Sequence, residues 1–373
     1  MKIALIQDQL LTPAGSERVF LYMAQEFKEA DLFTLCYNPE TTWPEFKKLK
    51  IRTHWLNRFI RNHRAFKIMF PIASLAMEHW DFSEYDLVIT SSATTAKYVR
   101  RFNAPHICYC YYPTRAIWSF GNYFGERLGI KEKVFSILLP YFKKRDIAAA
   151  RRVDQFIAIS ESSRKAINKY YGRESVVLSC PVDLDRLQRA NGAIREDYFL
   201  LVSRLERWKL VEYAVEAFNR LGLPLRIVGK GPEEAKLRAL AKDNVTFMGS
   251  VDDQTLARCY SGARAVIFTP ELEYGLVPIE ALASGTPVIA LGRGGVLETM
   301  IDIDDPLGRP ATAVLFPDPN AESLVAAVHR FQAASFSVES LVAHAASYGI
   351  PKFRQHLRRV VEEFLETRKG SMQ

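Results

Sequence analysis

Short apolar runs alternate with amphipathic segments from one end of the chain to the other. The runs predict β-strands, and the segments between them, whose apolar positions recur roughly every three to four residues, predict helices. In the first half, strands are expected at 3–6, 86–90, 106–110 and 155–159, and helices at 16–27 and 161–171. In the second half, strands are expected at 198–202, 225–228, 245–248, 265–268, 287–290 and 313–316, and helices at 210–221, 233–241, 252–260, 278–283 and 321–331.

Alternation of strand and helix is typical of parallel sheets with helices on both faces. Two such series in a chain of 373 residues predict two doubly wound α/β domains. A proline follows a strand in the segment Cys180–Asp183, so we expect the domains to span 1–181 and 182–373. A charged amphipathic helix is expected at about 352–368, and it can pack on either domain.

The composition is that of a globular protein, with 48% hydrophobic and 25% charged residues. The five cysteines lack metal-ligand spacing, the N-terminus lacks the shape of a signal peptide, and no apolar stretch reaches the roughly 18 residues of a membrane span. We therefore expect a cytoplasmic protein. Residues 1–180 hold 27 Lys and Arg against 17 Asp and Glu, which predicts an anionic partner: nucleic acid, phospholipid or a phosphorylated substrate.

Chemistry is expected where strands end, because parallel α/β sheets bind ligands at the carboxyl ends of their strands. Gly15 follows the first strand and precedes a helix, where a bare backbone admits an anion; a plain turn capped by Ser16 fits equally well. Arg204 and Lys209 follow the strand at 198–202. They suit a diphosphate, whose charge must be neutralised, although alone they also fit a solvated basic loop.

Two further segments follow strands of the second half. In 270–281, glutamates surround the start of a helix at Gly275, where carboxylates can accept hydrogen bonds from sugar hydroxyls and free N–H groups can bind phosphate. Complementarity to the helix dipole explains the same glutamates without any ligand. In 292–295, three of four residues are glycine, which is costly unless something requires the bare backbone.

The order and spacing of these motifs resemble the family-4 retaining glycosyltransferases, which have the GT-B fold of two facing Rossmann-like domains with a cleft between them. The resemblance is strongest to bacterial mannosyltransferase-like members that act in O-antigen, capsule or exopolysaccharide assembly. In the second half it rests on LVSRLERWK, LRIVGKGP, VTFMGSVDD and EYGLVPIEALASGTPVIALGRGG. In the first half it rests on the looser AGSERV, HICYCYYPTR, FIAISESSRKAI and CPVD.

The resemblance implies a role for each matching residue. Arg204 and Lys209 would bind the donor diphosphate, and Glu280 the nucleotide ribose. Backbone N–H groups of Gly275, Leu276 and Val277 would hold phosphate. Gly15 would lie under the donor. The base of the nucleotide would lie near Gly249 and Val251.

The chain departs from the family pattern at two positions. The family usually has a glutamate that contacts the donor sugar eight residues before Glu280, where this chain has Leu272 between Glu271 and Glu273. It often has a histidine where this chain has Tyr111, which donates a hydrogen bond but carries no positive charge at pH 7. We expect catalysis to rest on Tyr111, Glu273, Arg204 and Lys209; the alternative is that transfer is weakened or lost.

No metal or other cofactor is expected. Two Asp-x-Asp pairs, Asp183–Asp185 and Asp302–Asp304, have a pattern that some metal-dependent transferases use, but we interpret both as structural. The first lies in the expected domain boundary and the second in a loop rich in Asp, Pro and Gly. Donor charge is met by Arg204, Lys209 and helix ends instead.

An acid-free basic run lies at 52–67, where cations alternate with large apolar residues. The spacing of Arg58, Arg61 and Arg64 predicts that they share one helical face, with Lys67 close by. This pattern fits an interfacial helix on an anionic membrane or a contact to the acceptor, and equally a surface helix packed on its own domain. No nucleic-acid-binding module surrounds it, so nucleic acid is not expected as a partner.

These features predict a retaining, metal-independent glycosyltransferase at the inner face of the bacterial plasma membrane. It would move a hexosyl unit from a GDP- or UDP-linked sugar, with GDP-mannose favoured by the resemblance, to a lipid-linked or oligosaccharide acceptor. The rival hypothesis, motivated by Leu272 and Tyr111, is an inactive relative that binds nucleotide or glycan and scaffolds an active transferase.

Overall fold

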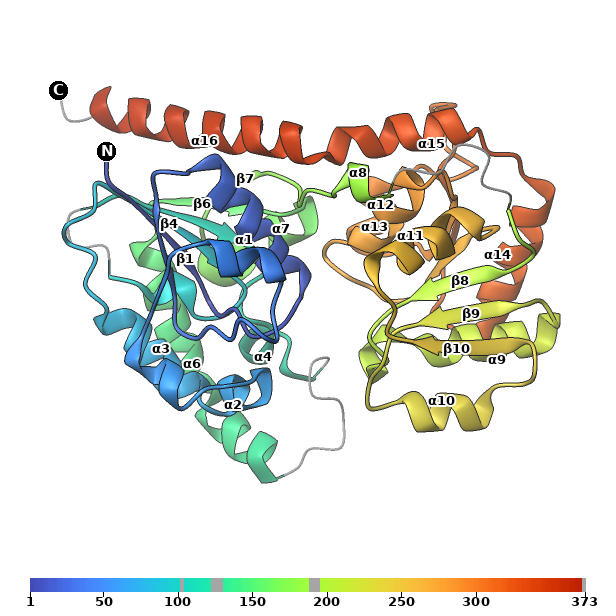
Figure 1. Cartoon of the computed structure of the whole chain (residues 1–373), viewed down its shortest axis with the longest axis horizontal. Coiled ribbons are helices and arrows are strands. Elements are labelled where there is room, and N and C mark those ends of the chain that lie inside the picture. The colour runs from blue at the N-terminus through green and yellow to red at the C-terminus, as the bar shows by residue number, and fades with distance from the viewer. Residues whose placement is uncertain (101–103, 122–129, 188–194, 371–373) are drawn as a thin grey trace. The chain divides into compact units, whose positions relative to one another are not determined.

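The computed structural model describes residues 1–100, 104–121, 130–187 and 195–370 (Figure 1). The chain divides into two compact units. The first comprises Met1–Ser179 with Phe353–Gln373, and the second comprises Cys180–Lys352. Each contains one parallel sheet with helices packed on it, so the predicted pair of doubly wound α/β domains is confirmed.

The described part of the first unit contains a seven-stranded parallel sheet. Its order is β3 (Ile51–Thr53), β2 (Asp31–Thr34), β1 (Ile3–Gln7), β4 (Leu87–Ser92), β5 (His106–Cys110), β6 (Gln155–Ala158) and β7 (Ser175–Val177). Central strands β1, β4 and β5 are buried at every position, because helices cover both faces. The helices are α1 (Gly15–Glu26), α2 (His63–Ile68), α3 (Phe70–His79), α4 (Arg115–Trp118), α6 (Ile130–Arg152) and α7 (Glu161–Tyr171), with short 3₁₀ turns η1 (Pro44–Lys48), η2 (Trp55–Arg58) and η3 (Ala96–Tyr98).

The described part of the second unit contains a six-stranded parallel sheet. Its order is β10 (Val245–Gly249), β9 (Leu225–Val228), β8 (Phe199–Val202), β11 (Val266–Phe268), β12 (Val288–Leu291) and β13 (Ala313–Phe316). Its helices and 3₁₀ turns are α8 (Leu184–Leu187), η4 (Arg207–Lys209), α9 (Val211–Leu221), α10 (Glu234–Leu240), α11 (Asp253–Gly262), α12 (Leu276–Ala283), α13 (Val296–Thr299), α14 (Ala321–Ala333), α15 (Val338–Ala345) and η5 (Ala346–Tyr348).

Local signals explain several helix ends. Ser160 caps α7 by accepting from the Ser163 N–H at 3.0 Å, and Gly172, with φ of 62°, ends that helix. Asp252 caps α11 by accepting from the Thr255 N–H at 2.8 Å. Ser16, by contrast, is not the cap of α1: the cap position is Ala14, and Ser16 lies within the first turn.

The sequence did not predict β2, β3, β7 or the long helix α6. The three strands have only three or four residues each and carry polar or exposed positions, so they lack a sustained apolar run. Helix α6 contains Pro140, and no single apolar stripe follows its length. These elements are stabilised by packing against the central strands rather than by local pattern.

The last helix, α16 (Ile350–Gly370), contributes its residues from Phe353 onward to the first unit. Arg354 and Arg358 both donate to the carboxylate of Glu26, at 2.7 and 2.5 Å. The ring of Phe353 meets that of Tyr109 edge-on, with centroids 5.9 Å apart. The C-terminal segment therefore packs on the N-terminal sheet.

Candidate functional site

The strand order of the second unit brings two predicted motifs together. Strand order reverses direction between β8 and β11, and this switch point is where open α/β sheets bind ligands. The loop with Arg204 and Lys209 follows β8, and the loop with Glu271 and Glu273 follows β11. The Thr269 hydroxyl donates to the Lys209 carbonyl at 2.7 Å, which joins the two loops.

Arg204 and Lys209 lie in a loop that displays cations at this switch point. The Arg204 side chain is 64% exposed, and its guanidinium lies 3.1 Å from the Glu206 carboxylate. The Lys209 ammonium lies over the Trp208 ring, 4.1 Å from its centroid. Leu210 follows with φ of 55°, the positive φ of a non-glycine residue, which costs about 1–2 kcal/mol in an L-residue. Such strain, observed beside two cations at a switch point, is typical of functional loops.

The loops after β8 and β9 and the end of β10 contact one another through glycines, which was not predicted from the sequence. A Cβ on Gly229 would lie 1.8 Å from the Ser203 carbonyl oxygen, and one on Gly231 would lie 2.3 Å from that of Leu205. Gly249, with φ of 68°, accepts from the Gly229 N–H at 2.8 Å. The sequence Gly229–Lys230–Gly231, directly after a strand, was the feature from which this contact could have been predicted. These glycines let the two loops and the end of β10 pack backbone to backbone, which fixes the loop of Arg204.

Exposed Lys230 lies between two of these glycines, and its Cε is 3.3 Å from where Gly249 would carry a Cβ. It thus adds a cation beside the segment Gly249–Val251, in which Val251 is half-buried. Lys230 was not predicted as a site residue, because a single lysine after a strand is ordinary in sequence.

Two glycines of 292–295, Gly294 and Gly295, allow a similar close approach of two loops. Gly294, with φ of 68°, would place a Cβ 2.2 Å from the Leu272 carbonyl oxygen, and Gly295 would place one 2.3 Å from that of Glu273. The Gly295 N–H donates to the Leu272 carbonyl at 2.7 Å. These two positions therefore need glycine because the loop after β11 packs directly against their backbone. Glu273 is half-buried in that loop.

Helix α12 begins at the end of this loop. Gly275 is its N-cap and Leu276 its first residue, so the N–H groups of Leu276 and Val277 belong to the first turn, where helices leave N–H groups without partners within the helix. A Cβ on Gly275 would lie 3.1 Å from the Phe268 ring. This turn follows β11 at the switch point, which is where an anion is best held.

Glu280, one turn further along α12, is held from two sides. Arg186 of α8 donates to one carboxylate oxygen at 3.2 Å, and the Tyr260 hydroxyl donates to the other at 2.8 Å. Arg186 also pairs with Asp253 at 2.7 Å. Burial and the Glu280 carboxylate raise the pKa of Tyr260 well above its usual value, so this phenol stays a hydrogen-bond donor. Arg186 was not predicted from the sequence, because it lies 94 residues from Glu280.

In the first unit, Tyr111 and the segment at Gly15 lie together. The Tyr111 hydroxyl lies 3.0 Å from the Ser16 carbonyl oxygen, to which it donates, and 3.0 Å from the Ser91 hydroxyl. Gly15 is the half-buried first residue of α1. Tyr111 follows β5 and Gly15 follows β1 in sequence. Strands β1 and β5 flank β4 in the sheet, so both residues lie at its carboxyl edge.

Glu17, two residues after Gly15, is a buried acid that the sequence analysis did not single out. Its side chain is 1% exposed and accepts from the hydroxyls of Ser16 and Thr12 at 2.8 and 3.3 Å. Burial raises its pKa from 4.5 to about 7, against the lowering effect of those hydrogen bonds. The Glu17 carboxyl therefore keeps its proton to a higher pH than an ordinary glutamate.

The basic run does not form the predicted single helix. Arg58 ends η2, Arg61 lies in the segment between, and Arg64 and Lys67 lie in α2. Asn62 interrupts the run, because it is extended (φ −148°) and caps α2 by accepting from the Ala65 N–H at 2.9 Å. The prediction of one shared helical face is wrong, although all four cations are exposed.

Both Asp-x-Asp pairs have structural partners. Asp183 accepts from the Arg186 N–H, Asp302 from the Leu315 N–H, and Asp304 pairs with Arg330 at 2.5 Å. Within the described ranges, no group of three or more His, Cys, Asp or Glu side chains is placed to hold a metal ion. In the same part of the chain, no helix combines the length and the apolar character needed to cross a bilayer.

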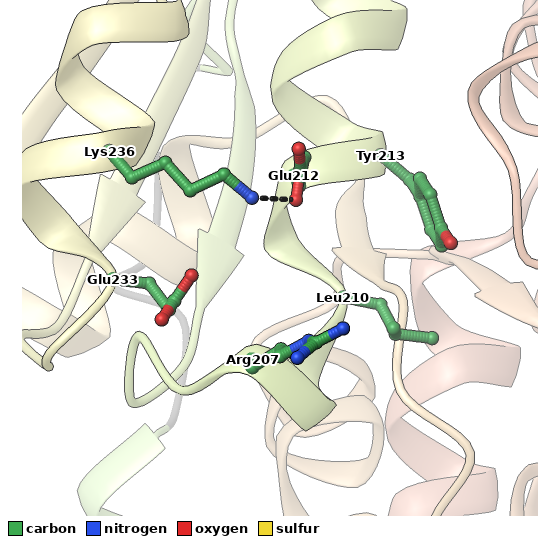
Figure 2. Close-up of a pocket in the computed structure, with 6 residues that line it drawn as sticks. All are labelled: Arg207, Leu210, Glu212, Tyr213, Glu233 and Lys236. Atoms are coloured by element: carbon green, nitrogen blue, oxygen red, sulfur yellow. Dashed lines mark hydrogen bonds and ion pairs between the residues drawn. The ribbon is translucent and has the colours of Figure 1, made fainter. Parts of the chain in front are cut away.

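A cavity of about 320 Å³ lies beside the loop of Arg204. Figure 2 shows Lys236 and Glu233 on one side of it and Tyr213 and Leu210 on the other. Lys236 donates to Glu212 at 2.6 Å within it. Arg207 lines this cavity, whereas Arg204 and Lys209 do not. We therefore place the candidate phosphate site at the cation pair and the α12 turn, outside this cavity.

Two family models match almost the whole chain. Residues 13–186 match "Glycosyltransferase Family 4", and residues 185–343 match "Glycosyl transferases group 1". An α-1,3/1,6-mannosyltransferase ALG2 of Kluyveromyces lactis is 23% identical over 292 residues, which cover 63% of this chain and 56% of that protein. The O-antigen chain mannosyltransferase C of Escherichia coli is 25% identical over 181 residues, 44% of this chain and 48% of that one. The chain spans about half the length of these curated relatives.

Solved structures share the fold over nearly the full chain. HepE of Anabaena, in complex with UDP, has a TM-score of 0.71 at 16% identity and covers 97% of this chain and 100% of its own. Sucrose-phosphate synthase of Thermosynechococcus elongatus has a TM-score of 0.74 at 18% identity, with coverage of 98% and 100%. These likenesses confirm the predicted GT-B fold class.

Proposed function

The chain belongs to the glycosyltransferases of group 1 and family 4, and from this membership we propose that it transfers a hexosyl unit from a nucleoside-diphosphate sugar to a lipid-linked saccharide. The observation that carries the proposal is the pairing of Arg204 and Lys209 with the N-terminal turn of α12 at the β8/β11 switch point. The cations and the free N–H groups together suit a diphosphate, both when it is bound and when it leaves.

In the proposed reaction the bond between the anomeric carbon and the diphosphate oxygen breaks while the bond to the acceptor oxygen forms. The acceptor attacks from the face of the leaving group, so configuration is retained, and the departing phosphate takes the acceptor proton. Arg204, Lys209 and the N–H groups of Gly275, Leu276 and Val277 stabilise the charge on that phosphate. We propose that this happens without a metal ion, since the cations and helix end meet the charge.

The other assigned residues bind or orient the donor. Glu280 accepts hydrogen bonds from the ribose hydroxyls, and Arg186 and Tyr260 orient its carboxylate by occupying one oxygen each. The base lies near Gly249 and Val251, beside Lys230. Glu273 contacts the donor sugar, and for Gly15 and Tyr111 we propose the roles that the resemblance to the family implies. The second unit, Cys180–Lys352, thus binds the donor, and the first unit, Met1–Ser179 with Phe353–Gln373, binds the acceptor.

Substitution of the cations tests the diphosphate assignment. We expect Arg204→Ala and Lys209→Ala each to lower kcat by about 10²–10³-fold, the usual effect of removing a group that stabilises a leaving charge. Arg207→Ala is the matched control, because Arg207 lies in the same loop but lines the separate cavity. Turnover like that of the wild type in either Arg204→Ala or Lys209→Ala would remove the assignment.

The donor is proposed to be GDP-mannose, in keeping with the mannosyltransferase names of two relatives. UDP-sugars are the alternative, because HepE is described in complex with UDP and with UDP-glucose. A thermal-shift screen of GDP-, UDP-, ADP- and TDP-sugars distinguishes them, since a bound donor stabilises the fold by RT ln(1 + [L]/Kd). A larger shift with a UDP-sugar than with GDP-mannose would overturn the choice.

A scaffold without transferase activity is the second candidate, favoured by Leu272 and Tyr111. The Leu272 backbone supports the Gly294 loop, but its side chain offers no hydrogen bond to a sugar hydroxyl. If the wild type binds donor but never transfers, and the double variant Leu272→Glu, Tyr111→His transfers, the scaffold reading replaces the enzymatic one. Transfer by the wild type excludes it.

A further inference from the structure

Exposed apolar side chains gather on one part of the first domain. Of the thirteen exposed large hydrophobic residues in the described chain, eight lie in 55–75 and 137–141. They are Trp55, Phe59, Ile68, Ile72, Leu75, Ile137, Leu138 and Tyr141. Single exposed apolar residues are ordinary, but such a concentration marks a surface that another body covers.

Segment 55–75 spans η2, α2 and part of α3, segment 137–141 lies in α6, and α3 contacts α6. Phe70 of α3 meets Phe142 of α6, with ring centroids 5.9 Å apart, and Arg145 of α6 donates to Glu78 of α3 at 2.6 Å. Leu75, which is 43% exposed, lies one turn before Glu78 on α3, so this ion pair brings the exposed residues of α3 near those of α6.

The exposed apolar residues of α6 are connected to α3 through one further contact. Arg145, which is tied to Glu78, lies 5.9 Å from the centroid of the Tyr141 ring. Tyr141 is 55% exposed, and Ile137, one turn earlier on the same helical face, is 77% exposed. The apolar tips of α6 therefore extend the surface that begins on α3.

Cations surround these apolar tips. Residues 46–77 contain eight Lys and Arg and no Asp or Glu. Arg58, Arg61, Arg64 and Lys67 are all exposed, and on α6 so are Lys133 and Lys144. The acid nearest to this group on α3, Glu78, is neutralised by Arg145 and Arg152. We call the eight apolar residues and these six cations the apolar–basic face.

We propose that the apolar–basic face lies on an anionic phospholipid surface, with the apolar tips inserted between lipid headgroups and the cations on the phosphates. The proposal deepens the proposed function and rests on its lipid-linked acceptor. Aromatic and aliphatic tips flanked by Lys and Arg are the chemistry of interfacial binding, in which buried apolar area and attraction to anionic lipid both contribute. A nucleic-acid backbone would match the cations but leave the apolar tips in water.

Vesicle flotation of the full chain tests the proposal without any transfer assay. We expect binding to vesicles of phosphatidylcholine with phosphatidylglycerol and none to phosphatidylcholine alone, with binding reduced at high salt. Ile137→Asp should weaken binding by at least about ten-fold, because it removes an inserted side chain and adds an anion. Leu307→Asp is the matched control, since Leu307 is 75% exposed on the other domain.

Charge reversal tests the electrostatic part. Arg61→Glu and Lys67→Glu should each weaken binding to the anionic vesicles by roughly five-fold or more, whereas Lys28→Glu, at an exposed lysine elsewhere on the first domain, should change it little. All these sites are exposed, so thermal unfolding should stay unchanged. Absence of binding to anionic vesicles, or equal binding by wild type and Ile137→Asp, overturns the proposal.

The outcome is independent of the catalytic proposal. If the chain binds and transfers a nucleotide sugar but does not bind vesicles, the proposed function stands and the proposed membrane surface is rejected. If it binds vesicles in a way that depends on Ile137 but transfers no sugar, the membrane surface stands and the proposed function is rejected. Binding of phosphatidylcholine vesicles equal to that of anionic ones would contradict the role given to the cations.

Discussion

At the scale of single residues, buried charge and its partners decide what each site can do. In the first domain, Lys97 and Asp146 form an ion pair of 3.0 Å with neither side chain exposed. Lys97 also donates to the Thr94 carbonyl and the Thr114 hydroxyl, and Asp146 accepts from Tyr98, Trp118 and Tyr171. Because every donor of this lysine is used, we interpret the pair as a structural link behind the Tyr111 segment.

Glu17 differs, since it is buried without a cation, and it gives a pH prediction. Its folded pKa of about 7 lies above its ordinary value of 4.5, so the folded state holds the proton more tightly than the unfolded state. Its contribution to stability is complete below pH 4.5 and is lost as the pH rises from there through about 7. Glu17→Gln, which resembles the protonated acid, should therefore raise the free energy of unfolding above pH 7 by about 2–3 kcal/mol.

The measurement is urea unfolding of wild type and Glu17→Gln at acidic and alkaline pH. The two curves should coincide below pH 4.5 and separate above pH 7, with the variant more stable. Glu29→Gln, at an exposed glutamate just after α1, is the control and should show no such separation. A variant less stable than the wild type at alkaline pH would contradict the assignment.

At the scale of elements, loops that follow adjacent strands support one another through their backbones. The loop after β11 is bridged to the loop after β12 by Leu272 and Gly294. The loop after β8 rests on the glycines after β9. The loop of Arg204 and Lys209 and the loop before α12 are therefore held in place by backbone contacts to glycines of the neighbouring loops.

This packing predicts unequal costs for two glycine substitutions. Gly294 and Gly308 have φ of 68° and 63°, so alanine is strained at both by about 1 kcal/mol. At Gly294 the new Cβ also meets the Leu272 carbonyl oxygen at 2.2 Å, whereas at Gly308 nothing lies within 4 Å. We expect Gly294→Ala to lower the free energy of unfolding by about 1–3 kcal/mol more than Gly308→Ala.

Chemical denaturation of both variants gives the difference directly. Gly294→Ala should also weaken donor binding in the thermal-shift assay, because the displaced loop contains Glu273 and leads into α12. Equal destabilisation by the two substitutions would contradict this prediction, because it would mean that the loop at Leu272 moves away from the new Cβ without loss of stability.

At the scale of the whole molecule, the chain returns to its first domain at the end. Phe353, 3% exposed, packs on Tyr109 of the central strand β5, and Arg354 and Arg358 hold Glu26 of α1. The Arg354 and Arg358 guanidinium groups lower the pKa of Glu26, against the opposing effect of burial. Residues more than 300 apart in sequence thus stabilise one core.

We expect Phe353→Ala to destabilise the first domain by about 3 kcal/mol, the usual cost of removing a buried aromatic side chain. Intrinsic fluorescence is a suitable probe, because Trp43, Trp55, Trp80 and Trp118 lie in the first unit and only Trp208 in the second. Val342→Ala, at a site that is 41% exposed on α15, should leave the transition unchanged. An unchanged transition for Phe353→Ala would show that α16 does not stabilise this domain.

The sequence by itself determined the secondary-structure alternation and therefore the two parallel sheets. Hydrophobic period is a local property of strand and helix geometry, so β5, β9, β13 and α7 have the predicted bounds. The same logic placed Arg204, Lys209, Gly275 and Gly294 after strands, where ligands bind. The roles of the individual residues stay proposals, to be decided by the experiments above.

Only the tertiary structure decided which distant groups meet. The Arg186–Glu280 pair, the bridge from Leu272 to Gly294 and the joining of α3 to α6 depend on strand order and helix packing, which no local pattern specifies. The basic run is divided because Asn62 satisfies the N–H groups of a new helix, which charge spacing does not reveal. Local periodicity fixes elements; long-range contacts, formed only when those elements pack, fix the site.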